Sequence, residues 1–345
     1  LELSAGFGDL SRIEFSDNEP RPLWQALARG AGERVTHWPP GLQHSYTNVP
    51  PGLTAAVIER VSGSSFEDYL DRTVLEPLGM PTASLDPVPG LPGGFQADGV
   101  TKIPYWHMTF KAFGALNASI AEMARFAEAL LNLGLLDGKS ALPADLIDAF
   151  FTPSATLGAA AGLEVTYARG SYGWVRGGHV FWGHGGDADG YRSRYGLLRE
   201  HARGYLIVIN TDDPRLLGRL RRTIEDALVA DLPTHPSLAT NEADLDRYVG
   251  SYYPTSARFG FDRWQRGEAA PATIRAATGH LEFQRGESRT RLLPAGDGRF
   301  VRPNDPAVTV VFARDAAGYL HLQGELGNFV HLSGGSCPGF IGACE

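Results

Sequence analysis

Apolar residues in the first third of the chain recur at helical intervals. One such run begins after Pro50, which the first turn of a helix tolerates, and ends at Gly63. A second run begins at Phe66 and is expected to stop before Pro77, because proline lacks the N–H that a helix interior needs. The pattern therefore predicts two consecutive helices near the start of the chain.

The middle of the chain changes from helical to strand periodicity. Residues 119–122 (Ser-Ile-Ala-Glu) form a capping box, which predicts the start of an amphipathic helix that continues through Leu131. After Tyr172, the pattern predicts successive strands at 179–182, 191–198 and 205–209, joined by Gly-rich or charged turns.

The strand at 205–209 is apolar throughout, as expected for a strand covered on both faces. An Arg-rich amphipathic helix at 216–232 could lie across this sheet. An antiparallel sheet flanked by helices defines an α+β domain, which we place at residues 1–235.

Beyond a linker at 233–241, the chain contains only short β-like runs separated by Gly, Asp, Asn and Pro. Such spacing without helices predicts a small barrel or sandwich at residues 236–335, followed by a flexible tail at 336–345. The predicted strands are 280–283, 290–293, 299–301, 308–312, 319–322 and 328–332.

Composition excludes several classes of function. The 345 residues are 43% hydrophobic and carry a net charge of −8, which argues against nucleic-acid binding. No run of 18 or more apolar residues occurs, so no transmembrane segment is predicted. The only lysines are Lys102, Lys111 and Lys139.

The tripeptide Tyr46-Thr-Asn48 is the first candidate for chemistry. A tyrosine and an asparagine two positions apart on an extended turn can point into the same cleft. Tyrosine acts as a base only when adjacent cations lower its pKa from about 10. Asparagine supplies both a donor and an acceptor. An ordinary loop remains the alternative.

The second candidate is Gly183-His184-Gly185-Gly186-Asp187, which follows the predicted strand 179–182. Glycines at a strand edge allow a ligand to approach the backbone, and a backbone N–H there could face a developing oxyanion. The alternative is the start of a hairpin with an exposed histidine.

Taken together, the segments resemble the β-lactamase-related serine hydrolases, which include class C β-lactamases, family VIII esterases, D-aminopeptidases and penicillin-binding proteins. This family carries an SxxK motif, a Tyr-x-Asn and a Lys/His-x-Gly on an edge-facing strand. Tyr46–Asn48 resembles the second motif, and His184–Gly186 resembles the third. Intervening blocks match in order over roughly residues 1–230, including 57–63, 76–80 and 190–193.

The resemblance implies a role for each matching residue. Tyr46 would move the proton of a nucleophilic serine, and Asn48 would hold the carbonyl or amide of the substrate. His184 would shape the local field beside Tyr46. The segment of Gly185, Gly186 and Asp187 would bind substrate, with the N–H of Asp187 forming half of an oxyanion hole.

The sequence also departs from the family pattern. No serine is followed by a lysine three positions later, and no Gly-x-Ser-x-Gly occurs. The family places SxxK before a segment that residues 1–7 resemble, so we expect the nucleophile before residue 1 and the chain as given to be inert. Gly185 replaces a threonine or serine whose hydroxyl often faces a substrate carboxylate, which favours esters or amides without one. A non-catalytic binder on the same scaffold is the rival hypothesis.

The remaining expectations concern the C-terminal region and the ligands. Residues beyond about 240 resemble the lipocalin-like β-domain often attached in this family. Its aromatic residues form either a pocket or simply a core (Tyr252, Tyr253, Phe261, Trp264 and Phe300). We expect no cofactor and no metal, and a small-molecule ester, amide or peptide substrate. Cys337 and Cys344 could pair in an oxidising compartment or stay free thiols, so a periplasmic or secreted location is slightly favoured. The oligomeric state stays open.

Overall fold

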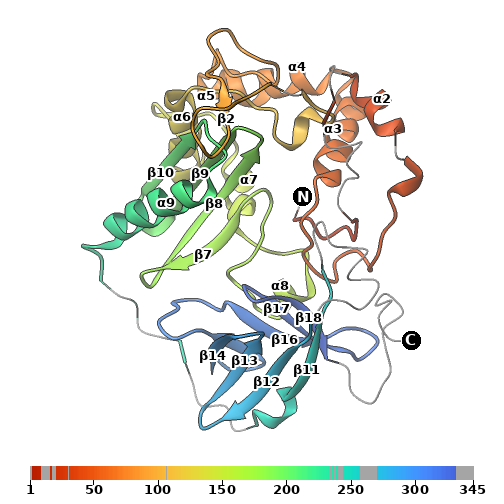
Figure 1. Ribbon diagram of the computed structural model, residues 1–345, viewed down its shortest axis with the longest axis vertical. Coiled ribbons are helices and arrows are strands. Elements are labelled where there is room, and N and C mark those ends of the chain that lie inside the picture. Colours follow the sequence, from red (N-terminus) through yellow and green to blue (C-terminus); the bar gives the residue numbers. More distant parts are fainter. Residues whose placement is uncertain are drawn as a thin grey trace.

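The computed structural model describes residues 2–8, 16–17, 21–29, 31–105, 107–233, 235, 238–239, 244–256 and 270–331. Two β-structures organise these residues: a four-stranded sheet flanked by helices and a closed eight-stranded barrel. Figure 1 shows the sheet above the barrel, with the N-terminal helices beside the sheet. An α+β domain followed by a β-barrel is therefore confirmed.

The sheet is antiparallel throughout and has the order β10-β9-β8-β7. Its strands are β7 (Tyr172–Arg176), β8 (His179–Ala188), β9 (Tyr191–Leu198) and β10 (Arg203–Ile209). Short turns join consecutive strands. Gly177 and Gly178 both have positive φ, as a two-residue hairpin turn between β7 and β8 requires.

Helices cover both faces of this sheet. On one face, Leu217 and its neighbours in α9 (Pro214–Val229) pack against Phe181, Tyr205 and Ile207. On the other face, α6 (Ile120–Leu131) and α7 (Ala144–Phe151) pack against Trp182, Tyr195 and Leu197. Successive residues of one strand face opposite sides, so each strand contributes to two separate cores. The short α8 (Leu157–Ala160) follows α7 and leads toward the barrel.

Two predicted helix boundaries are confirmed, the end of the first helix at Gly63 and the start of the helix at the Ser119 capping box. The first predicted helix is α3 (Val49–Ser62), and Gly63 ends it with φ 72°. In the capping box, Ser119 Oγ accepts from the N–H of Glu122 at 3.2 Å, and the N–H of Ser119 donates to Glu122 Oε2 at 2.9 Å. The remaining N-terminal elements are α2 (Leu23–Ala28), η1 (Ala31–Glu33) and α4 (Phe66–Leu70).

The second predicted helix does not stop before Pro77. After α4, the chain continues through the π-helical segment η2 (Asp71–Leu75) into α5 (Glu76–Leu78), which Gly79 ends in a left-handed conformation. Pro77 lies in the first turn of α5, where its missing N–H costs no intrahelical bond.

One further expectation about the sheet was wrong. β8 continues six residues past Trp182, because its glycine-rich end pairs with β9 up to Ala188 and Tyr191.

The apolar strand at 205–209 is β10, and helices contact it from both faces. α9 packs on Tyr205 and Ile207, and α6 and α7 pack on Leu206. Val208 stays 61% exposed, and β10 is the edge strand of the sheet.

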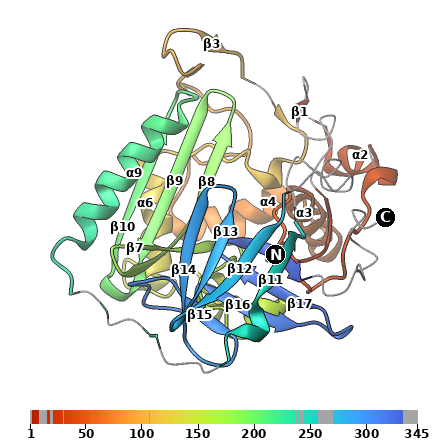
Figure 2. The same ribbon diagram turned by 60° about the horizontal axis from the view of Figure 1, so that its bottom comes forward.

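The barrel is closed and contains β11 to β18, each strand pairing antiparallel with its neighbours (Figure 2). Its core is made of side chains from every strand, among them Tyr252, Phe283, Phe300 and Phe329. The strands are β11 (Gly250–Pro254), β12 (Ala272–Ala277), β13 (His280–Arg285), β14 (Ser288–Pro294), β15 (Arg299–Val301), β16 (Val310–Arg314), β17 (Leu320–Gly324) and β18 (Gly327–His331), preceded by η5 (Asp246–Tyr248).

The aromatic residues of the barrel that the structure describes are mostly core. Tyr252 and Phe300 are fully buried, whereas Tyr253 is only partly buried. Phe261, Trp264, Cys337 and Cys344 lie outside the described residues, as do most of the expected linker and the expected tail.

Two-residue strands complete the architecture: β1 (Ser16–Asp17) pairs with β4 (His107–Met108), β2 (Gly94–Phe95) with β3 (Lys102–Ile103), and β5 (Leu135–Leu136) with β6 (Lys139–Ser140). Two 3₁₀ segments, η3 (Lys111–Phe113) and η4 (Arg199–His201), precede α6 and β10. Among the described residues, every helix is too short or too polar to cross a bilayer.

Candidate active site

β8 extends beyond its neighbour β7, which exposes one edge of the sheet. The β7–β8 ladder ends at the pair Tyr172 and Gly183, whereas the β8–β9 ladder runs on to Ala188. From His184 onward, β8 therefore has a ladder on one side alone within the described part of the chain. The glycine-rich motif lies inside this strand, which is the first strand of the β8–β9 hairpin, and His184 is half-buried rather than exposed.

The glycines of this motif are explained first by packing. A Cβ on Gly183 would lie 2.1 Å from the carbonyl oxygen of Tyr195, and a Cβ on Gly186 would lie 2.6 Å from Ser193 Oγ. A Cβ on Gly185 would lie 3.1 Å from the guanidinium carbon of Arg194, on the α9 side of the sheet. The space that a side chain at position 185 would need is thus filled by the guanidinium of Arg194, in β9.

His184 faces the opposite side of the sheet from Arg194. Its ring Nδ1 lies 2.6 Å from the carbonyl oxygen of Gly185, and its Nε2 is hydrogen-bonded to the hydroxyl of Tyr167. A carbonyl oxygen only accepts, so Nδ1 must carry the proton. Nε2 of the neutral ring then accepts from Tyr167. These two contacts fix both the tautomer and the orientation of His184.

The structure brings the two sequence motifs together. The ring centroids of Tyr46 and His184 lie 6.0 Å apart, and Tyr46 meets Tyr167 edge-on at the same distance. Asn48, two residues after Tyr46, is 5% exposed and occupies the N-cap position of α3. The predicted pairing of Tyr46 with His184 is therefore a feature of the fold.

The loop that carries Tyr46 is held from two directions. From the N-terminal segment, the carbonyl of Leu3 accepts from the N–H of Ser45 at 2.9 Å, and the carbonyl of Gly8 accepts from Thr47 Oγ1 at 2.8 Å. Residues before and after Tyr46 are thus both bonded to the first eight residues of the chain.

The barrel holds the same loop from the other direction. Asn328 Nδ2 donates to the carbonyl of His44 at 2.6 Å, and Gln323 Nε2 donates to the carbonyl of Leu42 at 2.7 Å. Gln43 Nε2 donates to the carbonyl of Thr255 at 2.6 Å. These side chains are polar yet buried or half-buried, so the bonds are shielded from water.

Sequence reasoning missed Tyr167 and His44, which complete the cluster. The two rings stack at 4.6 Å with an interplanar angle of 12°. Burial lowers the pKa of His44 to about 4, against an opposing effect of the nearby Glu2. His44 is therefore neutral at pH 7. The signal for His44 was its place two residues before Tyr46, whereas Tyr167 lies in a loop without a motif.

The far end of the motif faces solvent. Gly186 and Asp187 are exposed, and the carboxylate of Asp187 forms an ion pair with Arg192 at 2.6 Å. The Asp187 side chain is therefore occupied on the surface, which leaves its backbone as the part that could meet a ligand. An aromatic cluster with a fixed histidine beside an open strand edge can bind and orient a polar group and move a proton.

A helix-flanked antiparallel sheet with Tyr-x-Asn and His-x-Gly at its open edge defines the β-lactamase and transpeptidase-like class of fold. The sequence profile of the Beta-lactamase family matches residues 1–229, and the chain belongs to this family. Members of the family are serine hydrolases that act on amides and esters.

Solved structures share the fold at low sequence identity. SurE in complex with D-Leu is 21% identical with a TM-score of 0.51, and the match covers 96% of this chain and 77% of that one. The octameric penicillin-binding protein homologue from Pyrococcus abyssi is 16% identical with a TM-score of 0.52, covering 95% and 76%. The D-amino acid amidase from Ochrobactrum anthropi SV3 is 17% identical with a TM-score of 0.53, covering 66% and 75%. No curated protein matches the sequence significantly.

Proposed function

We propose that this chain forms the substrate-binding and proton-transfer part of a serine hydrolase that cleaves a small ester or amide through an acyl-enzyme. The observation that carries the proposal is the meeting of Tyr46 and His184, with ring centroids 6.0 Å apart, at the edge where β8 has passed β7. Two hydrogen-bonding side chains therefore converge where a substrate can reach the backbone.

In this proposal each residue has a definite role. A serine oxygen attacks the carbonyl carbon of the substrate while Tyr46 accepts its proton and passes it to the leaving group. Asn48 holds the carbonyl or amide of the substrate, and His184 shapes the local electrostatic field beside Tyr46. The N–H of Asp187 faces the oxyanion as half of the oxyanion hole, where a preorganised donor is worth most, and Gly185 and Gly186 let the substrate approach the strand. Water then releases the acyl group.

In this proposal the serine and its lysine lie outside these 345 residues. The sequence contains no Ser-x-x-Lys. Lys111 is paired with Asp86 at 2.9 Å and Glu67 at 3.2 Å, and Lys102 and Lys139 are exposed in the short β2–β3 and β5–β6 hairpins. The hydrogen bonds of Leu3 and Gly8 to the Tyr46 loop support a nucleophile helix that would arrive from the N-terminal side.

The substrate class is narrowed by Gly185. Without a hydroxyl at this position, esters and amides that lack a carboxylate are the favoured substrates. Two of the structural neighbours are described with D-amino acids, SurE with D-Leu and the amidase with D-Phe. D-amino acid amides therefore belong in the test panel beside p-nitrophenyl esters, with a chromogenic cephalosporin as the member that carries a carboxylate.

The test compares the chain as given with the same chain extended by the residues its gene encodes upstream. The extended chain should hydrolyse a member of the panel, and Tyr46→Phe should reduce its kcat by about 100-fold or more, in line with losing a general base. The chain as given should be inert. Hydrolysis by the chain as given that disappears in Tyr46→Phe would contradict an external nucleophile.

The absence of Ser-x-x-Lys also favours a second candidate, a non-catalytic binding protein on the same scaffold. It requires that the upstream codons contain no such motif and that neither chain hydrolyses the panel. A panel member should then still raise the unfolding temperature of the chain as given, because a ligand that binds only the folded state stabilises it.

A further inference from the structure

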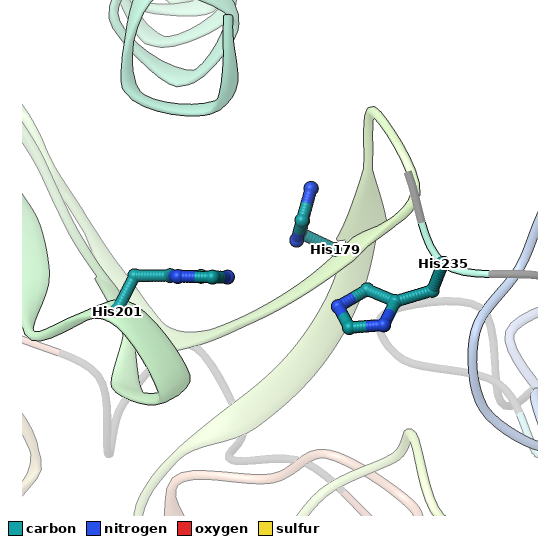
Figure 3. Close-up of side chains that lie close together, drawn as sticks. All are labelled: His179, His201 and His235. Carbon is teal, nitrogen blue, oxygen red and sulfur yellow. The ribbon is translucent and has the colours of Figure 1, made fainter. Parts of the chain in front are cut away.

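Three histidines from distant parts of the sequence converge at the end of the sheet opposite the candidate active site. His179 begins β8, His201 ends the 3₁₀ turn η4 between β9 and β10, and His235 follows α9. One ring nitrogen of each lies within 4.8 Å of the others. Figure 3 shows the ring of His179 between those of His201 and His235.

The convergence is set by the fold. The β8–β9 register pairs Trp182 with Leu197, so continuing it would place His179 opposite position 200, next to His201. At the other side, a Cβ on Gly177 in the β7–β8 turn would lie 2.8 Å from Val229, the last residue of α9. The hairpin tip and the end of α9 are therefore in contact.

An ion pair holds the end of α9 against the start of β10, beside η4. Arg203, the first residue of β10, donates to the carboxylate of Asp231 at 2.5 and 2.8 Å and to the carbonyl of Leu228 at 2.7 Å. A bidentate guanidinium–carboxylate pair fixes direction as well as distance. The chain leaving α9 is thus directed past His201, where His235 follows.

The hydrogen bonding of these rings points to a ligand. His179 is 1% exposed, and both of its ring nitrogens are buried without a hydrogen-bond partner among the described residues, as is Nε2 of His201. Burying a polar atom without a partner costs free energy. Three imidazole nitrogens this close to one another could be satisfied together by a single cation.

We propose that His179, His201 and His235 bind one Zn²⁺ ion, with the carboxylate of Glu200 or a water as the fourth ligand. Glu200 Oε2 lies 3.5 Å from Nε2 of His235. Imidazole nitrogen suits zinc and neighbouring transition metals, whereas Mg²⁺ and Ca²⁺ prefer oxygen ligands. Zinc accepts three histidines with a carboxylate or water in tetrahedral geometry.

The site requires only a small closure. Zinc–nitrogen bonds of about 2.0–2.1 Å put tetrahedral ligand atoms roughly 3.4 Å apart, so nitrogens within 4.8 Å of each other must approach by at most about 1.4 Å. His235 is exposed and His201 lies on a turn, so both side chains can rotate.

This site is separate from the proposed active site. His179 and His184 are five residues apart on one extended strand, which places them about 17 Å apart. The metal would join the sheet to the segment that leads from α9 toward the barrel, because His235 belongs to that segment and the other two ligands to the sheet. It is a structural clamp, and the hydrolytic chemistry does not depend on it.

The test uses the 345-residue chain without a polyhistidine tag. Zn²⁺ affinity is measured by competition with a chromophoric chelator, and Co²⁺ is added as a spectroscopic probe of tetrahedral coordination. We expect one Zn²⁺ per chain, a visible tetrahedral Co²⁺ spectrum, and an increase in unfolding temperature on adding Zn²⁺. His280, an unburied histidine at the start of β13, provides the control variant His280→Ala.

His201→Ala and His235→Ala carry the test, because their side chains are not fully buried and their loss leaves the sheet core intact. Each should weaken Zn²⁺ binding by at least about 100-fold, the upper range for losing even an indirect contact to a ligand, while His280→Ala leaves it unchanged. The proposal is overturned if the wild-type chain binds no stoichiometric Zn²⁺. It is equally overturned if folded His201→Ala and His235→Ala, checked by circular dichroism, bind Zn²⁺ as tightly as wild type.

Discussion

The hydroxyl of Tyr167 donates to Nε2 of His184, while Nδ1 of the same ring donates to the carbonyl oxygen of Gly185. Imidazole in water distributes its proton between the two nitrogens. Here the carbonyl, which only accepts, places the proton on Nδ1, and the hydroxyl stabilises the same tautomer by donating to the bare Nε2. Tyr167 is thus a positioning residue for the histidine of the proposed active site.

This relationship predicts the tautomer of His184. Nitrogen chemical shifts of the ring, measured by NMR at pH 7.5, should show the proton on Nδ1 in the wild-type chain. In Tyr167→Phe, Nε2 loses its donor, and the shifts should move toward a mixture of tautomers. The ring of His280, with its own carbonyl contact at 3.1 Å, should be unaffected. Unchanged His184 shifts in Tyr167→Phe would contradict the assignment.

His44 predicts a loss of stability in mildly acidic solution. Burial lowers its pKa from 6.5 to about 4, so the folded chain holds fewer protons than the unfolded chain between these values. The stabilisation is complete above pH 6.5 and is lost as the pH falls through 4, amounting to up to about 3 kcal/mol.

Urea unfolding between pH 7 and pH 4 measures this effect. His44→Phe keeps an aromatic ring against Tyr167 but cannot be protonated, so its free energy of unfolding should fall less over the same interval. His280→Gln should follow the wild-type curve. If His44→Phe and wild type lose stability in parallel, His44 is not the group responsible.

The lowered pKa of Glu122 predicts a second loss of stability, at more acidic pH. Burial alone would raise the pKa of its carboxyl, but hydrogen bonds from Ser119 and Thr82 outweigh burial and lower the pKa to about 2. Because the folded pKa lies below the unfolded value of 4.5, this stabilisation is present above pH 4.5 and is lost as the pH falls toward 2.

Glu122→Gln should therefore destabilise the chain by about 2 kcal/mol at pH 7, as expected for losing charge-assisted hydrogen bonds. The difference from wild type should shrink toward pH 2, as followed by thermal unfolding. Glu128→Gln, at an exposed position of the same helix, is the matched control. Equal effects of the two substitutions would show that the capping carboxylate has no special role.

Gln323 predicts how strongly the barrel is coupled to the rest of the chain. Its amide accepts from the N–H of Gly158 at 2.8 Å and donates to the carbonyl of Leu42 at 2.7 Å, and it is 2% exposed. Gln323→Ala should lower the free energy of unfolding by about 2–3 kcal/mol, because it leaves two buried backbone groups without partners.

The control for this prediction is Gln284→Ala. Gln284 also lies in the barrel, but its amide bonds only to the carbonyl of Gly286 at 3.3 Å near the surface. Its loss should change stability by less than about 0.5 kcal/mol. Similar costs at the two positions, measured by urea unfolding, would mean that the contact with Leu42 and Gly158 adds nothing.

Much of the fold was predictable because the signals are local. The capping box at Ser119 and the glycine after Ser62 act through neighbours in sequence, so the ends of α6 and α3 were predicted. Strand β11, with glycine and proline at its ends, and the alanine-rich β12 were missed, because their strand conformation comes from pairing within the barrel. The end of β8 was also missed, because its strand conformation comes from pairing with β9.

The candidate site divides in the same way. Tyr46 and His184 were found from motifs, and the structure places them together. Tyr167 was not found, because a tyrosine in an irregular loop gives no signal until the loop is placed in three dimensions. The three histidines at positions 179, 201 and 235 were likewise invisible, since their spacing in sequence matches no ligand pattern and only strand register unites them.

The amides of Gln323 and Asn328 have a consequence for protein engineering. They bond to the carbonyls of Leu42 and His44, in the loop that carries Tyr46, so the barrel helps to hold this loop in place. Exchanging this barrel for one from a relative would preserve the architecture yet remove these donors. A working chimera would therefore need glutamine and asparagine at the same positions of strands β17 and β18. It would also need a backbone carbonyl at the position of Thr255 to accept the hydrogen bond from Gln43.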